Sequence, residues 1–166
     1  MDQMNNNIPT AEPTNAKPTY ETPTNPVSFN TAPVGQLKTS RGLVKYILLS
    51  LITLGIYSLV YYSSISTDIN VIASRYDGKK TMHYCLLFFI VAPITFGIGS
   101  LVWYHKLSTR IGNELARRGI GYNFNAGTFW LWNIVGTMLF GIGPFVYLHK
   151  LSKAMNLLSA DYNARG

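Results

Sequence analysis

Three long stretches of the chain contain no charged residue, and this feature constrains the fold more than any other. The stretches lie between Lys45 and Asp68, between Lys80 and Lys106, and between Arg118 and Lys150. Each exceeds the roughly 20 apolar residues that a helix needs to cross a bilayer. Tyr and Trp residues crowd their ends, as is typical at the level of lipid headgroups. The sequence therefore predicts an all-α membrane protein, located as a multi-pass protein in the cell membrane.

The composition and the charge support this prediction. Hydrophobic residues make up 48% of the chain, and charged residues make up only 13%. The net charge of +7 indicates either a nucleic acid or an anionic lipid surface as a partner. The basic residues are divided among the flanks of the apolar stretches, so they cannot easily form one stripe along a nucleic acid. We therefore expect anionic headgroups of membrane lipid as a partner, and no nucleic acid.

The ends of the three stretches align with one another without gaps. The aligned segments are LGIYSLVYYSSISTDIN (54–70), FGIGSLVWYHKLSTRIG (96–112) and FGIGPFVYLHKLSKAMN (140–156). Gly55, Gly97 and Gly141 correspond at offsets of 42 and 44. Agreement of this density indicates three tandem repeats of about 43 residues. Their approximate bounds are 43–78, 82–119 and 127–161, within a three-repeat domain over 39–160.

Each repeat is predicted to be an apolar helix that is broken or kinked at a glycine and followed by an amphipathic helix. In the second part, apolar residues recur at helical spacing, for example at Ile65, Ile69 and Ile72, which places them on one helix face. Glu114 lies one helical turn after Arg110 and one turn before Arg117 and Arg118, which predicts pairing on the helix surface. The residues predicted to form the breaks or kinks are Gly55, Pro93, Gly97, Gly99, Gly141, Gly143 and Pro144.

The glycine breaks allow two arrangements in a bilayer, or a mixture of the two. Kinked single spans would place the matching basic ends on opposite faces of the membrane. The two faces would then have nearly equal numbers of basic residues, so the distribution of Lys and Arg gives no orientation. Hairpins would place every basic end on one face, but they free backbone groups at the tip. Arms of about ten residues reach only half of the apolar core. Kinked single spans are therefore the preferred prediction.

Residues 1–38 differ from the rest of the chain. They are rich in Asn, Pro and Thr, with a proline every few residues. Proline removes a backbone donor, and few large apolar residues are present to offset the entropy of ordering. The segment is predicted to be a disordered tail, either a spacer or a site that recruits a protein partner.

Two His-Lys pairs are the best candidates for a binding site. His105-Lys106 and His149-Lys150 occupy equivalent positions and could bind a metal ion or an anionic headgroup. The simpler interpretation is that Lys extends to the membrane interface and His lies beside it. Trp103, Tyr104 and Tyr147 are further candidates for contact with the interface or headgroups.

Other kinds of site find little support in the sequence. No carboxylate lies inside an apolar stretch, which argues against proton-coupled transport and against paired-carboxylate catalysis. The single cysteine, Cys85, excludes a disulfide within the chain and a thiolate zinc site. No catalytic, cofactor-binding or metal-ligating residue is assigned.

Three short phrases resemble a known family. They are T-L-G-I-Y at 53–57, R-Y-D-G-K at 75–79 and W-Y-H-K-L-S at 103–108. Together they are similar to the bacterial membrane family called domain of unknown function 4234, over roughly 40–160. The resemblance implies a multi-pass protein of the bacterial cytoplasmic membrane, and it implies no activity and no catalytic residues.

We therefore expect a non-enzymatic scaffold, adaptor or membrane-organising protein with basic, lipid-facing tails and no cofactor. A protein partner could bind the N-terminal tail, and the chain could form a homo-oligomer. An oligomeric pore or small-solute transporter is the alternative. A membrane enzyme that acts on lipid is a third hypothesis, which rests on the His-Lys pairs alone.

Overall fold

The computed structural model describes residues 33–166, and their regular secondary structure is entirely helical. Residues 1–32 of the predicted tail lie outside the described residues. The helices are α1 (Leu43–Ile52), α2 (Ile56–Asp77), α3 (Tyr84–Leu86), the π-helix η1 (Leu87–Val91), α4 (Ala92–Ile94), α5 (Ile98–Arg117), α6 (Ala126–Thr128), the π-helix η2 (Phe129–Val135), α7 (Gly136–Phe140) and α8 (Gly143–Arg165).

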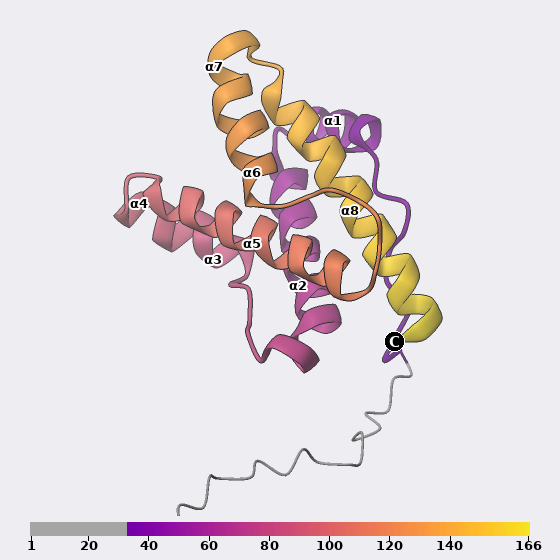
Figure 1. The fold of residues 1–166 in the computed structure, drawn as a ribbon. Coiled ribbons are helices and arrows are strands. Elements are labelled where there is room, and N and C mark those ends of the chain that lie inside the picture. Colours follow the sequence, from indigo (N-terminus) through magenta and orange to yellow (C-terminus); the bar gives the residue numbers. More distant parts are fainter. Residues whose placement is uncertain (1–32) are drawn as a thin grey trace, which may run out of the picture. The chain divides into compact units, whose positions relative to one another are not determined.

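Each repeat is a helical hairpin made of a short arm and a long helix. The arms are α1, the continuous run α3–η1–α4, and the continuous run α6–η2–α7; the long helices are α2, α5 and α8. Figure 1 shows the second and third arms lying beside the long helix that follows each of them. The chain reverses at each glycine break, so each apolar stretch is divided between two helices.

The turns of the first two hairpins are built alike. Gly55 and Gly97 adopt φ values of +91° and +86°, which glycine tolerates because it has no Cβ. In each turn a threonine hydroxyl joins the two helices. Thr95 Oγ1 donates to the Val91 carbonyl at 2.7 Å and accepts from the Gly99 amide at 2.9 Å. Thr53 makes the same two bonds with Leu49 and Tyr57.

The core lies where the three long helices cross, and equivalent positions of the repeats fill it. Buried positions repeat in register as Tyr61, Trp103 and Tyr147; Ile65, Leu107 and Leu151; Ser66, Ser108 and Ser152; and Ile69, Ile111 and Met155. Ile65, Ile69 and Ile72 were predicted to share one helix face, and that face is buried in the core, because all three are 0% exposed. The three repeats therefore complete one shared core, as stacked repeats do.

Two hydrogen bonds follow the repeat order through this core. The Tyr61 hydroxyl lies 2.6 Å from Ser152 Oγ, which joins the first repeat to the third. The Tyr147 hydroxyl lies 2.9 Å from Ser108 Oγ, which joins the third repeat to the second. In the second repeat the equivalent residue is Trp103, which donates its indole N–H to the Met82 carbonyl at 2.8 Å instead of bonding to a core serine. The indole N–H and the phenol hydroxyl lie at different positions on their side chains, so the two residue types reach different partners.

Ion pairs hold the inner ends of the hairpins together. Arg110 forks onto Asp77, with Nε 2.7 Å from Oδ2 and Nη2 3.0 Å from Oδ1. Glu114 accepts from Arg117 and Arg118, and Arg118 also donates to Asp161 of α8 at 2.7 Å. Pairing of Glu114 with Arg117 and Arg118 was expected, whereas Arg110 binds across to α2 instead of to Glu114, its neighbour on α5.

The prediction of a multi-pass membrane fold is wrong for the described residues. Within 33–166, no helix combines the length and the apolar character that crossing a bilayer requires. The physical reason is the division at each glycine. The arms are short, with α1 only 10 residues long, and each long helix is apolar in its first turns and polar beyond them. Kinked single spans, the preferred arrangement, are excluded with it.

Candidate functional site

Large apolar side chains are exposed along the three hairpin ends, which we define as residues 47–60, 86–102 and 130–145. At the turns, Leu54 is 94% exposed, Phe96 is 96% exposed and Met138 is 83% exposed. The other exposed apolar residues of these ends are Ile47, Leu48, Leu51, Ile52, Ile56, Val60, Leu86, Phe88, Phe89, Ile90, Ile94, Ile98, Leu101, Val102, Trp130, Leu131, Val135, Leu139, Ile142 and Phe145.

The hairpin ends stay exposed because the shared core does not extend to them. The long helices meet over their inner turns, which we define as the turns that follow Tyr61, Trp103 and Tyr147, and there apolar residues occupy one face. Toward the turns the sequence is apolar on every side, but each arm packs mainly against its own long helix. Its outer side therefore has no neighbour among residues 33–166. Apolar surface of this extent on a protein usually marks an interaction site.

In two of the turns, the residue with an exposed apolar side chain has an unfavourable backbone conformation. Leu54 and Phe96, which directly precede the turn glycines, adopt φ values of +50° and +49°. An L-residue in this left-handed region costs about 1–2 kcal/mol. Neither side chain is buried, so packing within residues 33–166 does not offset this cost. The third turn is different, because only Gly141 has a positive φ there.

The residues predicted as breaks all lie at the hairpin turns or at close contacts beside them. A Cβ on Gly143 would collide with the Trp132 carbonyl oxygen, so glycine is required where α8 approaches its arm. A Cβ on Gly99 would lie 2.6 Å from Val91 Cγ1, a side chain that can move. Pro144 lies in the first turn of α8, where a missing N–H is tolerated, and Pro93 lies within the continuous helical run of the second arm, just after the π-helix η1.

The two His-Lys pairs lie on different long helices, at the inner border of the hairpin ends. His105 and His149 are both exposed, and His105 Nδ1 accepts a hydrogen bond from Trp130 Nε1 at 3.1 Å. Lys106 is exposed and Lys150 is half-buried. The described residues contain no group of three or more side chains that could hold a metal ion.

The three aromatic candidates lie in or against the core. Trp103 and Tyr147 are 5% and 1% exposed, and burial raises the pKa of the Tyr147 hydroxyl although its hydrogen bond to Ser108 opposes the shift. Tyr104 is half-buried and stacks on Phe129, with ring centroids 5.6 Å apart. These positions do not support contact with lipid headgroups. The spacing that places Tyr147 four residues before Leu151 on one face was the signal for burial.

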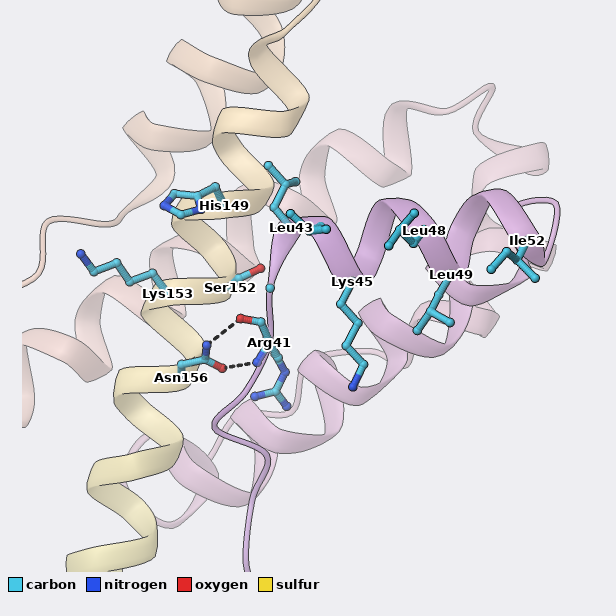
Figure 2. Close-up of a pocket in the computed structure, with 12 residues that line it drawn as sticks. Arg41, Leu43, Lys45, Leu48, Leu49, Ile52, His149, Ser152, Lys153 and Asn156 are labelled. Carbon is cyan, nitrogen blue, oxygen red and sulfur yellow. Dashed lines mark hydrogen bonds between the residues drawn. The ribbon is translucent and has the colours of Figure 1, made fainter.

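A groove of about 980 Å³ lies between α1 and α8. Figure 2 shows Leu48, Leu49 and Ile52 along its α1 side. Sequence reasoning missed the contact that shapes it, in which the Asn156 side chain clasps the Arg41 backbone. Asn156 Oδ1 accepts from the Arg41 amide at 2.9 Å, and Nδ2 donates to the Arg41 carbonyl at 2.8 Å. Asn163 clasps Leu37 in the same way, so residues 33–42 form an extended strap along α8.

The basic side chains around this groove are largely engaged. The Arg41 guanidinium pairs with Asp68 and also lies 3.3 Å from Ser159 Oγ. Burial raises the pKa of Asp68, although Arg41 opposes the shift. Lys153 Nζ lies 5.3 Å from the centre of the Tyr122 ring. Lys45 is the remaining cation of the lining among the described residues.

Residues 41–113 match the family model described as "Domain of unknown function (DUF4234)". The predicted family is therefore confirmed over this stretch, which contains the first repeat and most of the second. The third repeat lies outside the matched residues, although its turn and buried positions align with those of the other two. No curated protein and no solved structure matches the chain.

Proposed function

We propose that the chain is a non-enzymatic scaffold that attaches to anionic lipid surfaces through its hairpin ends. The observation that carries the proposal is the pair of turns at Leu54 and Phe96. There the backbone is held in an unfavourable region while an apolar side chain is almost fully exposed. Such a side chain gains free energy only when something outside the described fold covers it. Attachment of this kind enters one face of a bilayer and does not require a helix that crosses it.

The dimensions of the hairpin ends fit one lipid leaflet. Along α5, the eight residue steps from Ile98 to Lys106 rise about 12 Å. From Ile142, the residue before α8, to Lys150, eight residue steps rise the same distance. Half of the apolar core of a bilayer is about 15 Å. A hairpin end that is immersed to this depth would bring Lys106 and Lys150 to the level of the headgroups.

The charge of the chain supports an anionic surface. Lys and Arg number 14 against 7 Asp and Glu, and the hairpin ends themselves contain no charged residue. A Lys or Arg near an anionic membrane adds about 1 kcal/mol to binding. The predicted protein partner of the N-terminal tail stays a proposal, because residues 1–32 lie outside the described part. A pore would need helices that cross the bilayer, so we do not propose it.

The test is co-sedimentation of the full chain with vesicles of phosphatidylglycerol and phosphatidylcholine, compared with vesicles of phosphatidylcholine alone. The test variant combines Leu54→Ser with Phe96→Ser. A matched control combines Val34→Ser with Val44→Ser, because both valines are exposed and lie outside the hairpin ends. Burial of a large apolar side chain is worth about 1.5–3 kcal/mol, so the test variant should bind about 100-fold more weakly or worse.

Two outcomes would contradict the proposal. One is that the wild-type chain does not sediment with anionic vesicles. The other is that the chain forms oligomers which the test variant dissociates, with vesicle binding unchanged. In that case the hairpin ends would be covered by a second copy of the chain, as the predicted homo-oligomer requires.

A further inference from the structure

A second groove, of about 1090 Å³, runs beside α5 and combines an apolar half with a basic half. The apolar half lies toward the hairpin turn and is lined by Val91, Ile98 and Val102. The basic half lies toward the 78–83 loop and is lined by Lys79, Lys80 and Lys106. The two halves are continuous, because residues that line them recur every three or four positions along one face of α5.

The carboxylates near the basic half are already neutralised. Asp77 is held by the fork of Arg110, which also donates to the Lys79 carbonyl at 2.6 Å. Burial would raise the pKa of Asp77, but the hydrogen bonds from Arg110 and from the Lys79 amide outweigh it and lower the pKa. Glu114 is likewise engaged by Arg117 and Arg118.

The three lysines of the basic half are available to a ligand. Within residues 33–166, none of their ammonium groups lies within ion-pairing distance of a carboxylate, and all three side chains are exposed. Lys79 is close enough to Asp77 to contribute to the lowered pKa of that carboxyl. The groove therefore presents an uncompensated positive charge at one end and an apolar channel at the other.

We propose that this groove binds one anionic phospholipid. Lys79, Lys80 and Lys106 hold the phosphate, and an acyl chain lies along Val91, Ile98 and Val102. The absence of a side chain on Gly99 lets Val91 and Thr95 of the arm approach α5 closely along the wall of the channel. The rise of about 12 Å from Lys106 to Ile98 matches a chain that extends through most of one leaflet. The inference rests on the proposed function for its ligand class, and it deepens that function by assigning a stoichiometric site.

The groove between α1 and α8 provides a natural control. It has a similar volume and an apolar lining, but Arg41 is paired with Asp68 and Lys153 lies over Tyr122. Of these two grooves in residues 33–166, the one beside α5 therefore has three available lysines next to its apolar channel, whereas the one between α1 and α8 has Lys45. Selective binding of an anionic lipid should depend on the second groove and not on the first.

The experiment is calorimetric titration of the full chain with short-chain phosphatidylglycerol below its micelle concentration. Short-chain phosphatidylcholine and inorganic phosphate serve as comparison ligands. The test variant is Lys79→Gln, Lys80→Gln and Lys106→Gln. The control variant is Lys38→Gln, Lys45→Gln and Lys153→Gln, which removes the same charge elsewhere. Circular dichroism confirms that both variants keep the helical content of the wild type.

We expect one phosphatidylglycerol per chain, with about 100-fold weaker binding in the test variant, because three cations contribute about 1 kcal/mol each. The control variant should bind within about threefold of the wild type. Equal binding of phosphatidylcholine, or of inorganic phosphate alone, would overturn the inference. Equal weakening by the two variants would also overturn it, because the charge would then act without a site.

The failure of this inference can be told apart from the failure of the proposed function. If the wild type sediments with anionic vesicles but binds no short-chain lipid selectively, the groove is wrong and surface attachment stands. If it binds the short-chain lipid selectively but does not sediment with vesicles, the attachment is wrong and the groove stands.

Discussion

The inner turns of the three long helices and the hairpin ends are both rich in large apolar residues, but they have opposite exposure. In the inner turns, Ile65, Leu107 and Leu151 are completely buried. In the hairpin ends, Leu54 and Phe96 are almost completely exposed. The difference lies in what each part contacts. The inner turns of one repeat pack on those of the other two, whereas each hairpin end packs mainly on itself.

This comparison separates two uses of apolar sequence. Where apolar residues alternate with serines and charged residues at helical spacing, the helix has one buried face and contributes to the fold. Where they occupy every face, the fold leaves most of them exposed. Stability should therefore depend on the inner turns, and lipid binding should depend on the hairpin ends.

The largest effect on stability is expected from Ile111→Ala. Ile111 is 0% exposed and lies where the three long helices meet, so its truncation leaves a cavity. The free energy of unfolding should fall by about 2–5 kcal/mol, measured by chemical denaturation followed by circular dichroism. Ile94→Ala is the matched control, because Ile94 is 73% exposed in the second hairpin end. Equal losses in the two variants would show that the hairpin ends belong to the core.

The second-largest effect on stability is expected from acidification, which should weaken the ion pairs between arginines and carboxylates. The pKa values of Asp77, Glu114 and Asp161 are lowered, because hydrogen bonds and charges from arginines outweigh their burial. A lowered pKa contributes stability above the unfolded value of about 4, and this contribution is lost as the pH falls through the folded pKa. The free energy of unfolding should therefore decrease between about pH 5 and pH 2. In Asp161→Asn this decrease should be smaller, and an unchanged profile would contradict the assignment.

A smaller loss is expected when a hydroxyl between repeats is removed. Tyr147→Phe deletes the partner of Ser108 in the core, so the free energy of unfolding should fall by about 1 kcal/mol. Tyr57→Phe is the control, because within residues 33–166 no hydrogen bond from the Tyr57 hydroxyl is found. If both variants lose the same amount, the bond between Tyr147 and Ser108 does not contribute to the packing of the repeats.

Much of the inner part could be predicted from the sequence. The gapless alignment placed Ser66, Ser108 and Ser152 at equivalent positions, and the structure buries all three. The helical spacing of Ile65, Ile69 and Ile72 placed them on one helix face, and the structure buries that face. These signals were reliable because helical periodicity and core packing have the same physical origin.

Other parts could not be predicted in this way. A count of uncharged residues runs across the turn at Gly97 and adds the arm to the long helix, so two short apolar segments look like one span. The Arg110–Asp77 pair joins α5 to the end of α2, and no local spacing indicates it. The clasp of Asn156 on Arg41 depends on a separation of 115 residues. Such contacts are determined by the tertiary arrangement and leave no periodic signal.

The smallest expected change is a gain of stability from Phe96→Gly, which tests backbone strain and lipid attachment at the same turn. Phe96 has a φ of +49°, which glycine adopts without the steric cost of a Cβ. Relief of about 1–2 kcal/mol of strain, offset by the greater flexibility of glycine when unfolded, should raise the free energy of unfolding by about 0.5–1 kcal/mol.

Phe88→Gly provides the contrast, because it replaces an exposed aromatic residue inside the π-helix η1, where glycine is unfavourable. Both variants should bind anionic vesicles more weakly, but only Phe96→Gly should be more stable than the wild type. A gain of stability without a loss of vesicle binding would mean that the strained turn does not serve lipid attachment.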